Sequence, residues 1–311
     1  MGGLAVAALL AAVAVGCARS ARALSRASWP RRSPAAAILL WQALGLAGGL
    51  AAVGALLAIG VDGQRTRSAG VLGGLGRLAS GQLLQPHQSP LVATPRLAML
   101  AAGFALLSVL SWMLVIAFAD AIAARRRQRE LLALLARGDP KAPGALVVDY
   151  PAAAAYCLPG IRSQIVVSAG TLELLAPAEL AAVLAHERAH LRARHDLVLI
   201  PFTSLRRTFP RSGVVTQAYR TVALLVEMMA DDRALRVRGL FARELATALL
   251  RFGTAGAQCP AGALAAAEGE LTARVNRLLM PPPPLSRAAQ AMVVVTAAAL
   301  VLTPPLLLVV S

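Results

Sequence analysis

Long apolar runs set the pattern of this chain. Four stretches contain enough consecutive apolar residues to approach or exceed the roughly 20 that a helix needs to cross a bilayer. They are residues 1–18, 35–60, 97–124 and 288–310. We therefore predict an α-helical membrane protein with four transmembrane helices.

The first apolar run has two possible interpretations. It could be a signal peptide that ends at a lipidated Cys17. A signal peptide carries its positive charges before the apolar run, whereas here five arginines follow it. These are Arg19, Arg22, Arg26, Arg31 and Arg32. Their position favours a true transmembrane helix.

Two arginine clusters predict the orientation in the membrane. One covers residues 19–32, and the other covers residues 125–129 directly after the third run. Cytoplasmic loops are enriched in Lys and Arg, so both clusters belong inside. Both termini and a loop at 61–95 then lie outside the plasma membrane.

Because successive spans must cross the membrane in alternating directions, the chain divides into three parts. Residues 1–124 form a membrane region with three helices, residues 125–287 a cytoplasmic domain, and residues 288–311 a C-terminal transmembrane helix.

Between the third and fourth runs, the pattern changes to shorter elements. A helix continues over 125–136, and three short β-rich segments separated by Pro and Gly predict a small antiparallel sheet. The segments are 145–149, 153–157 and 164–168. Helical patterns follow over 177–197, 214–237, 240–252 and 264–279. The fold class of this part is therefore α+β.

Composition supports a membrane protein and argues against two other classes. Hydrophobic residues make up 58% of the chain, which is high for a soluble protein. The basic residues that give the net charge of +16 cluster beside the predicted spans and are scattered elsewhere, without interleaved aromatic residues, which favours contact with anionic lipid over nucleic acid. The three cysteines do not have the spacing of a metal site or of a disulfide framework.

The segment His186-Glu187-Arg188-Ala189-His190 carries the main candidate chemistry. Residues four apart on a helix face the same side, so both imidazoles can bind one zinc ion. Glu187 is then placed to accept a proton from a zinc-activated water and to pass it to a leaving amine. A structural role for the two histidines is the alternative.

A catalytic zinc ion needs a third protein ligand. Asp196 lies six residues after His190, where some zinc sites have a histidine, but position 193 lacks the glycine of that pattern. Glu227 is the better candidate, because it lies in an apolar run where an unpartnered carboxylate would be costly. Asp231, one turn later, would orient an imidazole. His195 would point away from the metal, as a surface or interfacial residue.

Residues 145–279 resemble the cytoplasmic peptidase domain of the BlaR/MecR antirepressors, membrane metallopeptidases of the gluzincin group. The resemblance rests on five motifs in this order after three spans. They are Leu158-Pro159-Gly160, Ile165-Val166-Val167-Ser168, residues 180–190, Glu227-Met228-Met229-Ala230-Asp231 and Arg274-Val275-Asn276-Arg277-Leu278.

The resemblance implies one zinc ion per chain, held by His186, His190 and Glu227, with Glu187 as the general base. It also implies four spans with the peptidase domain inside the cell. The penicillin-binding sensor domain of the antirepressors does not follow the fourth run in this sequence, which puts a β-lactam-sensing role in doubt.

The predicted function is hydrolysis of a protein or peptide substrate. We expect the enzyme to act in signal transduction by cleaving a cytoplasmic regulator, such as a transcriptional repressor. Arg274 or Arg277 could stabilise the transition state, with a structural salt bridge as the alternative for both, and Tyr156 and Tyr219 remain candidates. Two other functions stay open. One is a quality-control membrane peptidase of the HtpX kind, and the other is a membrane scaffold without catalysis.

Overall fold

The computed structural model describes residues 3–61, 76, 90–160, 163–237, 239–255 and 261–310. Most of the predicted outer loop at 61–95 lies outside these residues. Two compact units make up the chain. The first contains Met1–Val115, Ser204–Tyr219 and Leu285–Ser311, and the second contains Ile116–Thr203 and Arg220–Pro284. Residues 204–219 thus group with the first unit, although they lie within the predicted 125–287 domain.

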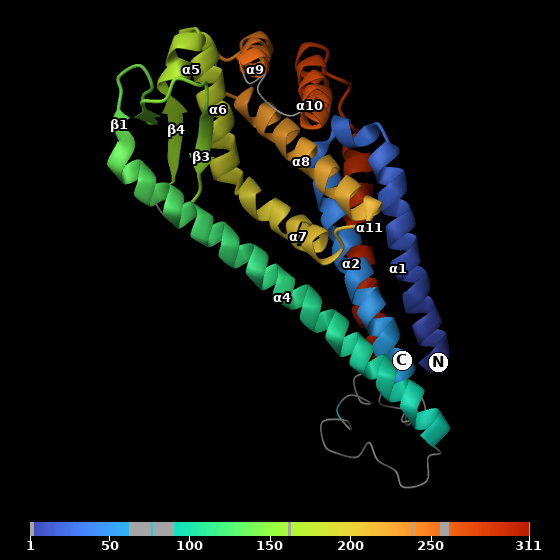
Figure 1. The fold of residues 1–311 in the computed structure, drawn as a ribbon. Helices are drawn as coiled ribbons and strands as arrows, with labels where there is room; N and C mark the ends of the chain where they lie inside the picture. The colour runs from blue at the N-terminus through green and yellow to red at the C-terminus, as the bar shows by residue number, and fades with distance from the viewer. Residues whose placement is uncertain are drawn as a thin grey trace. The chain divides into compact units, whose positions relative to one another are not determined.

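The first unit is built on long apolar helices. Helices α1, α2 and α11 lie side by side (Figure 1), and a short 3-10 helix, η1, joins α1 to α2. The bounds are α1 Gly3–Arg26, η1 Trp29–Arg32, α2 Pro34–Gly60, α4 Pro90–Leu135 and α11 Arg287–Val310, and the part of α4 after Val115 belongs to the second unit. Helix α1 therefore extends beyond the predicted end at residue 18.

Small residues on α2 let the neighbouring helices come close. A Cβ atom at Gly54 would lie 3.2 Å from Leu10 of α1 and 3.3 Å from Leu308 of α11. At Gly60, a Cβ would lie only 2.3 Å from Leu100 of α4, so no larger residue fits without movement. Close backbone approach at small residues is the usual way in which membrane helices pack.

Among the residues that the structure describes, four helices are long and apolar enough to cross a membrane. They are Gly3–Arg26, Pro34–Gly60, Thr94–Ala133 and Arg287–Val309. In length and composition, the prediction of four membrane-spanning helices is confirmed.

The second unit contains a four-stranded sheet of order β1-β2-β4-β3. Its strands are β1 Ala136–Gly138, β2 Leu146–Val148, β3 Ala155–Leu158 and β4 Gln164–Ser168. The β1–β2 and β3–β4 pairs are antiparallel, but β2 and β4 are parallel. The predicted all-antiparallel sheet is therefore wrong, and the sequence prediction missed β1.

The position of β4 explains the mixed sheet. Its Ile165-Val166-Val167 run is apolar on both faces, which suits a central strand. Ile165 and Val167 pack on one face with Leu180 and Val183 of the next long helix. Val166 packs on the other face with Leu132 at the end of α4. Because both faces of β4 must be covered, β4 inserts between β2 and β3.

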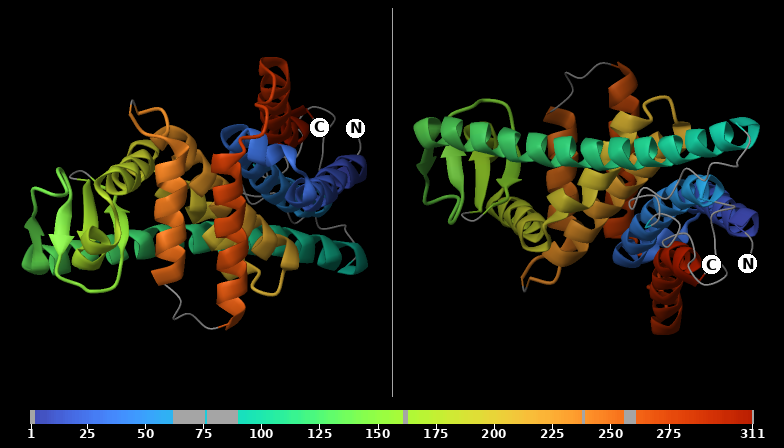
Figure 2. Two further views of the ribbon diagram at one scale, coloured as in Figure 1. Left: turned by 90° about the horizontal axis from the view of Figure 1, so that it is seen from above. Right: turned by 90° about the horizontal axis from the view of Figure 1, so that it is seen from below.

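In the described residues, six helices lie between the sheet and α11. Their bounds are α5 Ala169–Leu174, α6 Pro177–Ala193, α7 His195–Thr208, α8 Gly213–Ala234, α9 Ala242–Ala255 and α10 Ala261–Leu279. Helices α9 and α10 lie side by side (Figure 2).

The single helix predicted for 177–197 is wrong, because α6 ends at Ala193. Arg194 adopts a left-handed backbone conformation (φ 48°) and starts a new direction, which α7 follows from His195.

Candidate metal centre

Helix α6 is fixed at its start and along its apolar face. Pro177 occupies the first turn, where its missing N–H costs nothing. The Glu179 carboxylate accepts a hydrogen bond from the backbone N–H of Ala176 (2.8 Å) and lies 3.3 Å from an Arg251 guanidinium nitrogen. With its apolar residues packed on β4, α6 is a rigid support for the side chains of its later turns.

The structure brings His186, His190 and Glu227 together. The two imidazole Nε2 atoms lie 3.0 Å apart, and the Glu227 carboxylate oxygens lie 3.4 Å from His186 Nε2 and 3.5 Å from His190 Nε2. Zinc–nitrogen and zinc–oxygen bonds of about 2.0–2.2 Å in tetrahedral geometry separate ligands by roughly 3.3–3.5 Å. The nitrogen–oxygen distances, one to each Glu227 oxygen, are of this size, and the nitrogen–nitrogen distance is shorter. One ligand atom from each of the three residues lies within 4.8 Å of the others, so the group can hold a metal ion.

Asp231 and Arg274 hold this group in place. His186 Nδ1 lies 2.9 Å from Asp231 Oδ1, which orients the imidazole so that Nε2 faces His190 and Glu227. Arg274 of α10 donates two hydrogen bonds to the Asp231 carboxylate (2.7 and 3.0 Å) and lies 3.0 Å from Glu227 Oε2. Asp231, which was expected to orient an imidazole, therefore contacts His186, and Arg274 contacts the carboxylates of both Asp231 and Glu227.

Arg277, the second arginine predicted near the reaction, has a different partner. It donates two hydrogen bonds, of 2.6 and 2.8 Å, to the Asp232 carboxylate. This ion pair ties α10 to α8 one residue beyond Asp231.

The two candidate tyrosines have other neighbours. Tyr156 packs beside Leu158 and Val166, and the Tyr219 ring lies under the Arg206 guanidinium at 4.1 Å.

Burial and close charges shift the pKa values of these groups. Burial opposes charge on His186, but interactions with Asp231 and Glu227 outweigh it and raise the His186 pKa to about 9. For Glu227 and Asp231, burial acts to raise the pKa, but contacts with His186 and other neighbouring cations hold both values well below the ordinary range. Both carboxylates are therefore ionised at neutral pH, as metal ligation and orientation of a ligand require.

Glu187 lies beside the candidate metal ligands, but its pKa shifts in the opposite direction from those of Glu227 and Asp231. Burial raises its pKa above the ordinary value, although the charges of His186 and His190 act against this. A carboxylate whose pKa moves towards neutrality is better suited to accept and return a proton.

Cys157 is the site residue that the sequence prediction missed. It lies on β3 and lines a cavity of about 180 Å³ together with His190, Glu227 and other residues. Burial and the neighbouring Glu187, with which the thiol interacts, raise the Cys157 pKa to about 12. The thiol is therefore protonated. Its position comes from strand pairing, which cysteine spacing in the sequence does not reveal.

His195 corrects another prediction. Its side chain is buried, with 1% of the residue exposed, and its Nδ1 lies 3.0 Å from His190 Nδ1. The prediction of an outward-facing histidine assumed that α6 continues past residue 195. Because the chain turns at Arg194, His195 returns towards His190.

Asp196, the alternative third ligand, forms an ion pair with Arg125 of α4 at 2.5 Å. The group of described residues whose ligand atoms can meet at one ion contains His186, His190 and Glu227 and does not include Asp196. The arrangement thus has two imidazoles four residues apart, a carboxylate between them and a third donor from the next long helix.

A comparison with known families gives a match over the part of the chain that holds this arrangement. Residues 121–259, a little under half of the chain, match the model of peptidase family M48. These residues form a peptidase family M48 domain. No curated protein and no solved structure matches the chain.

The M48 domain is a zinc metallopeptidase domain, and its candidate zinc site is the His186, His190 and Glu227 group. Its substrate is a peptide. With four candidate spans in the chain, the protein is a membrane zinc metallopeptidase. The match ends at residue 259, before α10 and its Arg274. It supports the family and does not extend to the antirepressor subtype.

Proposed function

We propose that the protein is a membrane endopeptidase in which His186, His190 and Glu227 hold one zinc ion and Glu187 is the general base. The observation that carries this proposal is the meeting of two imidazole Nε2 atoms, 3.0 Å apart, with the Glu227 carboxylate, whose Oε2 lies 3.4 Å from His186 Nε2 and whose Oε1 lies 3.5 Å from His190 Nε2. Asp231 orients His186 from the other side of its imidazole.

The reaction is hydrolysis of a peptide bond. When bound, zinc supplies Lewis acidity that activates water at neutral pH. Glu187 accepts a proton from the attacking water as the new carbon–oxygen bond forms, and returns a proton to the amine nitrogen as the carbon–nitrogen bond breaks. The raised pKa of Glu187 supports both transfers.

Arg274 has a positioning role in this proposal. Its guanidinium contacts Glu227 and Asp231 together, so it fixes the third ligand and the residue that orients His186. Arg277 is occupied by Asp232 and supports α10 against α8. We therefore assign neither arginine to stabilisation of the oxyanion.

The sheet offers a place for an extended substrate. Strand β3 is at the edge of the sheet, paired with β4 on one side, and Cys157 of β3 lines the cavity beside His190. A peptide that adds to the free edge of β3 would gain main-chain hydrogen bonds and pass next to the metal site.

We also propose an orientation of the enzyme in the membrane and a class of substrate. The arginines at 19–32 and 125–129 support termini outside the plasma membrane and a peptidase domain on its cytoplasmic side. The same division would give a membrane region at 1–124, a peptidase domain at 125–287 and a last span at 288–311. A cytoplasmic regulator, such as a transcriptional repressor, is the substrate expected from this arrangement.

Metal analysis combined with an activity assay tests the catalytic proposal. Purified protein in detergent should contain about one zinc per chain and cleave a general protein substrate, with chelator removing both. Glu187→Gln should keep the zinc and lose activity by a factor of at least about 100. A Glu187→Gln variant with full activity would refute the role of this residue.

Cysteine labelling tests the orientation. In a background without native cysteines, an impermeant reagent should label Ser89→Cys in intact cells and leave Ser25→Cys unlabelled until the membrane is opened. Ser89 lies outside the described residues, so this expectation rests on the sequence alone. The reversed pattern would place the peptidase domain outside.

A further inference from the structure

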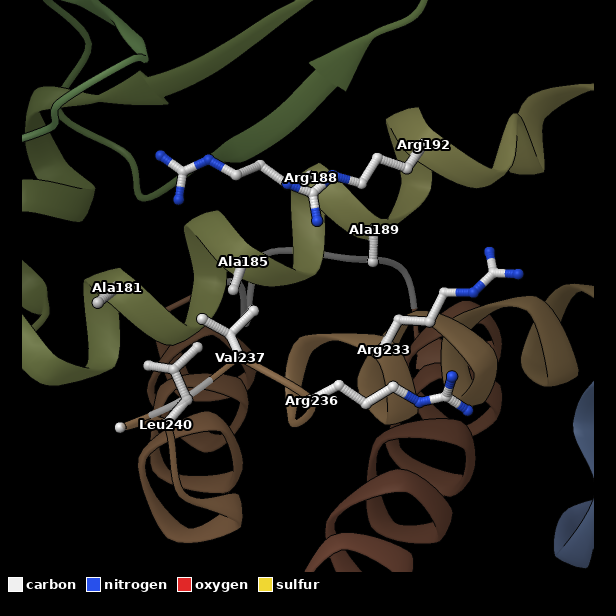
Figure 3. Close-up of a pocket in the computed structure, with 10 residues that line it drawn as sticks. Ala181, Ala185, Arg188, Ala189, Arg192, Arg233, Arg236, Val237 and Leu240 are labelled. Carbon is white, nitrogen blue, oxygen red and sulfur yellow. The ribbon is translucent and has the colours of Figure 1, made fainter.

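A second cavity lies within the peptidase unit, on another face of α6. Its volume is about 860 Å³, and it lies between α6 and the residues at and after the end of α8 (Figure 3). Ala181, Ala185 and Ala189 of α6 line it, together with Val237 and Leu240. These apolar side chains form a surface that an apolar group could contact.

Four arginines line the same cavity. Arg188 and Arg192 extend from α6, and Arg233 and Arg236 extend from the opposite wall (Figure 3). Arg188 donates a hydrogen bond to the Pro143 carbonyl at 3.0 Å. Within the described ranges, no ion pair joins any of the four to a carboxylate. Four like charges gathered without an anionic partner favour an anionic ligand from outside.

The cavity is connected to the metal centre by hydrogen bonds. An Arg233 guanidinium nitrogen lies 3.1 Å from His195 Nε2, and His195 Nδ1 lies 3.0 Å from His190 Nδ1. His190 Nε2 in turn lies 3.0 Å from His186 Nε2. A ligand that draws Arg233 towards itself would therefore act on a residue that touches a zinc-binding histidine.

The size and lining of the cavity indicate what kind of anion it takes. A volume of about 860 Å³ is far larger than a single small ion needs and lies in the range of sites for extended ligands. Arginines on two walls can contact carboxylates that are spaced along a chain, and the apolar surface between them can contact neighbouring aliphatic side chains.

We propose that this cavity binds an acidic segment of the protein substrate, in which carboxylates alternate with aliphatic side chains, at a position separate from the cleaved bond. This inference rests on the proposed peptidase function, because that function makes a peptide the expected occupant. It names a substrate class that the metal site alone does not select.

A binding experiment tests the site independently of catalysis. The full chain in detergent carries Glu187→Gln, so that bound peptide is not cleaved. The probe is a short fluorescein-labelled peptide of glutamate and leucine, followed by fluorescence anisotropy, and its counterpart has glutamine in place of each glutamate. The acidic peptide should bind at least about tenfold more tightly than the neutral one.

Two double variants with equal loss of charge locate the binding. Arg192→Ala/Arg236→Ala should weaken binding of the acidic peptide roughly tenfold. The control Arg220→Ala/Arg243→Ala removes two exposed arginines from α8 and α9 outside the cavity and should change the affinity less than twofold. Wild-type zinc content and apparent Tm in both variants would show that they are folded.

Three results would overturn the proposal. One is equal affinity for the acidic and neutral peptides, and another is an equal effect of the two double variants. The third is cavity-dependent binding of inorganic phosphate or of phosphatidylglycerol vesicles without binding of the acidic peptide, which would assign the site to a phosphate group. If cavity-dependent peptide binding appears but the wild-type protein hydrolyses no substrate, the peptidase proposal fails and the binding site stands.

Discussion

The two functional faces of α6 differ in how their charges are partnered. On the face of His186 and His190, the neighbouring carboxylates Glu227 and Asp231 are both in contact with Arg274. On the face of Arg188 and Arg192, four arginines line a cavity, and its described lining includes no carboxylate.

This difference indicates what each face does. The metal side contains the anionic and neutral donors that a dication requires, already held by internal hydrogen bonds, so it is preorganised for one small ligand. The arginine side has cations whose counter-charge must come from solvent or from a ligand. One helix therefore supports both the proposed chemistry and the proposed recognition of the substrate.

The largest effect expected on the metal side comes from Glu227→Ala. Loss of one of three ligands should lower zinc affinity by a factor of more than about 100, because an outer partner alone typically costs 10–100-fold. Zinc titration against a chelator of known affinity measures this. The control Glu244→Ala, on α9 outside the donor group, should leave the affinity unchanged. Retention of wild-type affinity by Glu227→Ala, with loss in Asp196→Ala, would move the third ligand to position 196.

Asp231→Asn should have the next largest effect. The variant weakens the interaction of residue 231 with His186 Nδ1 and removes the carboxylate that accepts two hydrogen bonds from Arg274. Zinc affinity should therefore fall about 10–100-fold. The free energy of unfolding should fall by about 3 kcal/mol, since Asp231 is 1% exposed. Chemical unfolding with and without zinc separates these two effects. Unchanged zinc affinity would show that Asp231 has only a structural role.

Much of this organisation could be predicted from the sequence, because it depends on local patterns. Apolar runs of sufficient length predict the four spans, and the i, i+4 spacing of His186 and His190 places both on one side of a helix. The structure also places Glu227 and Asp231 beside these histidines.

Other features depend on contacts that a local pattern does not contain. The turn after Ala193 uses a left-handed Arg194 where no Gly or Pro marks the end of the helix, so the return of His195 could not be foreseen. The parallel pairing of β2 with β4 accompanies burial of both faces of β4, one against α6 and the other against the end of α4. The arginine cavity likewise forms only when α6 meets the end of α8.

Salt should separate the two faces of α6. Raising the ionic strength from about 0.05 to 0.3 M shortens the screening length from roughly 14 to 6 Å, which weakens binding at exposed charges. Affinity of the cavity for the acidic peptide should fall about tenfold, whereas zinc affinity at the largely buried donor group should change less than threefold. Chelator competition and anisotropy at both salt concentrations measure this. Equal salt dependence would remove the proposed distinction between the faces.

A smaller effect is expected from pH in protein stripped of zinc. The His186 pKa is raised from its ordinary 6.5 to about 9, so the stabilisation that it provides is complete below pH 6.5 and is lost as pH rises through 9. The apparent Tm of the stripped protein should therefore decrease over this window. Asp231→Asn, which removes a main cause of the raised pKa, should flatten the decrease. A Tm that rises between pH 6.5 and 9 would contradict the assigned environment of His186.

The ligand set of the zinc ion is the central claim, and X-ray absorption at the zinc edge measures it most directly. The spectrum of the full chain should show only nitrogen and oxygen neighbours at about 2.0–2.2 Å, with the outer-ring scattering of two imidazoles. In Glu227→Ala that retains residual zinc, one oxygen neighbour should be lost and both imidazoles should remain. A sulfur neighbour at about 2.3 Å, which would bring Cys157 into the metal site, or a spectrum with fewer than two imidazoles would contradict the account.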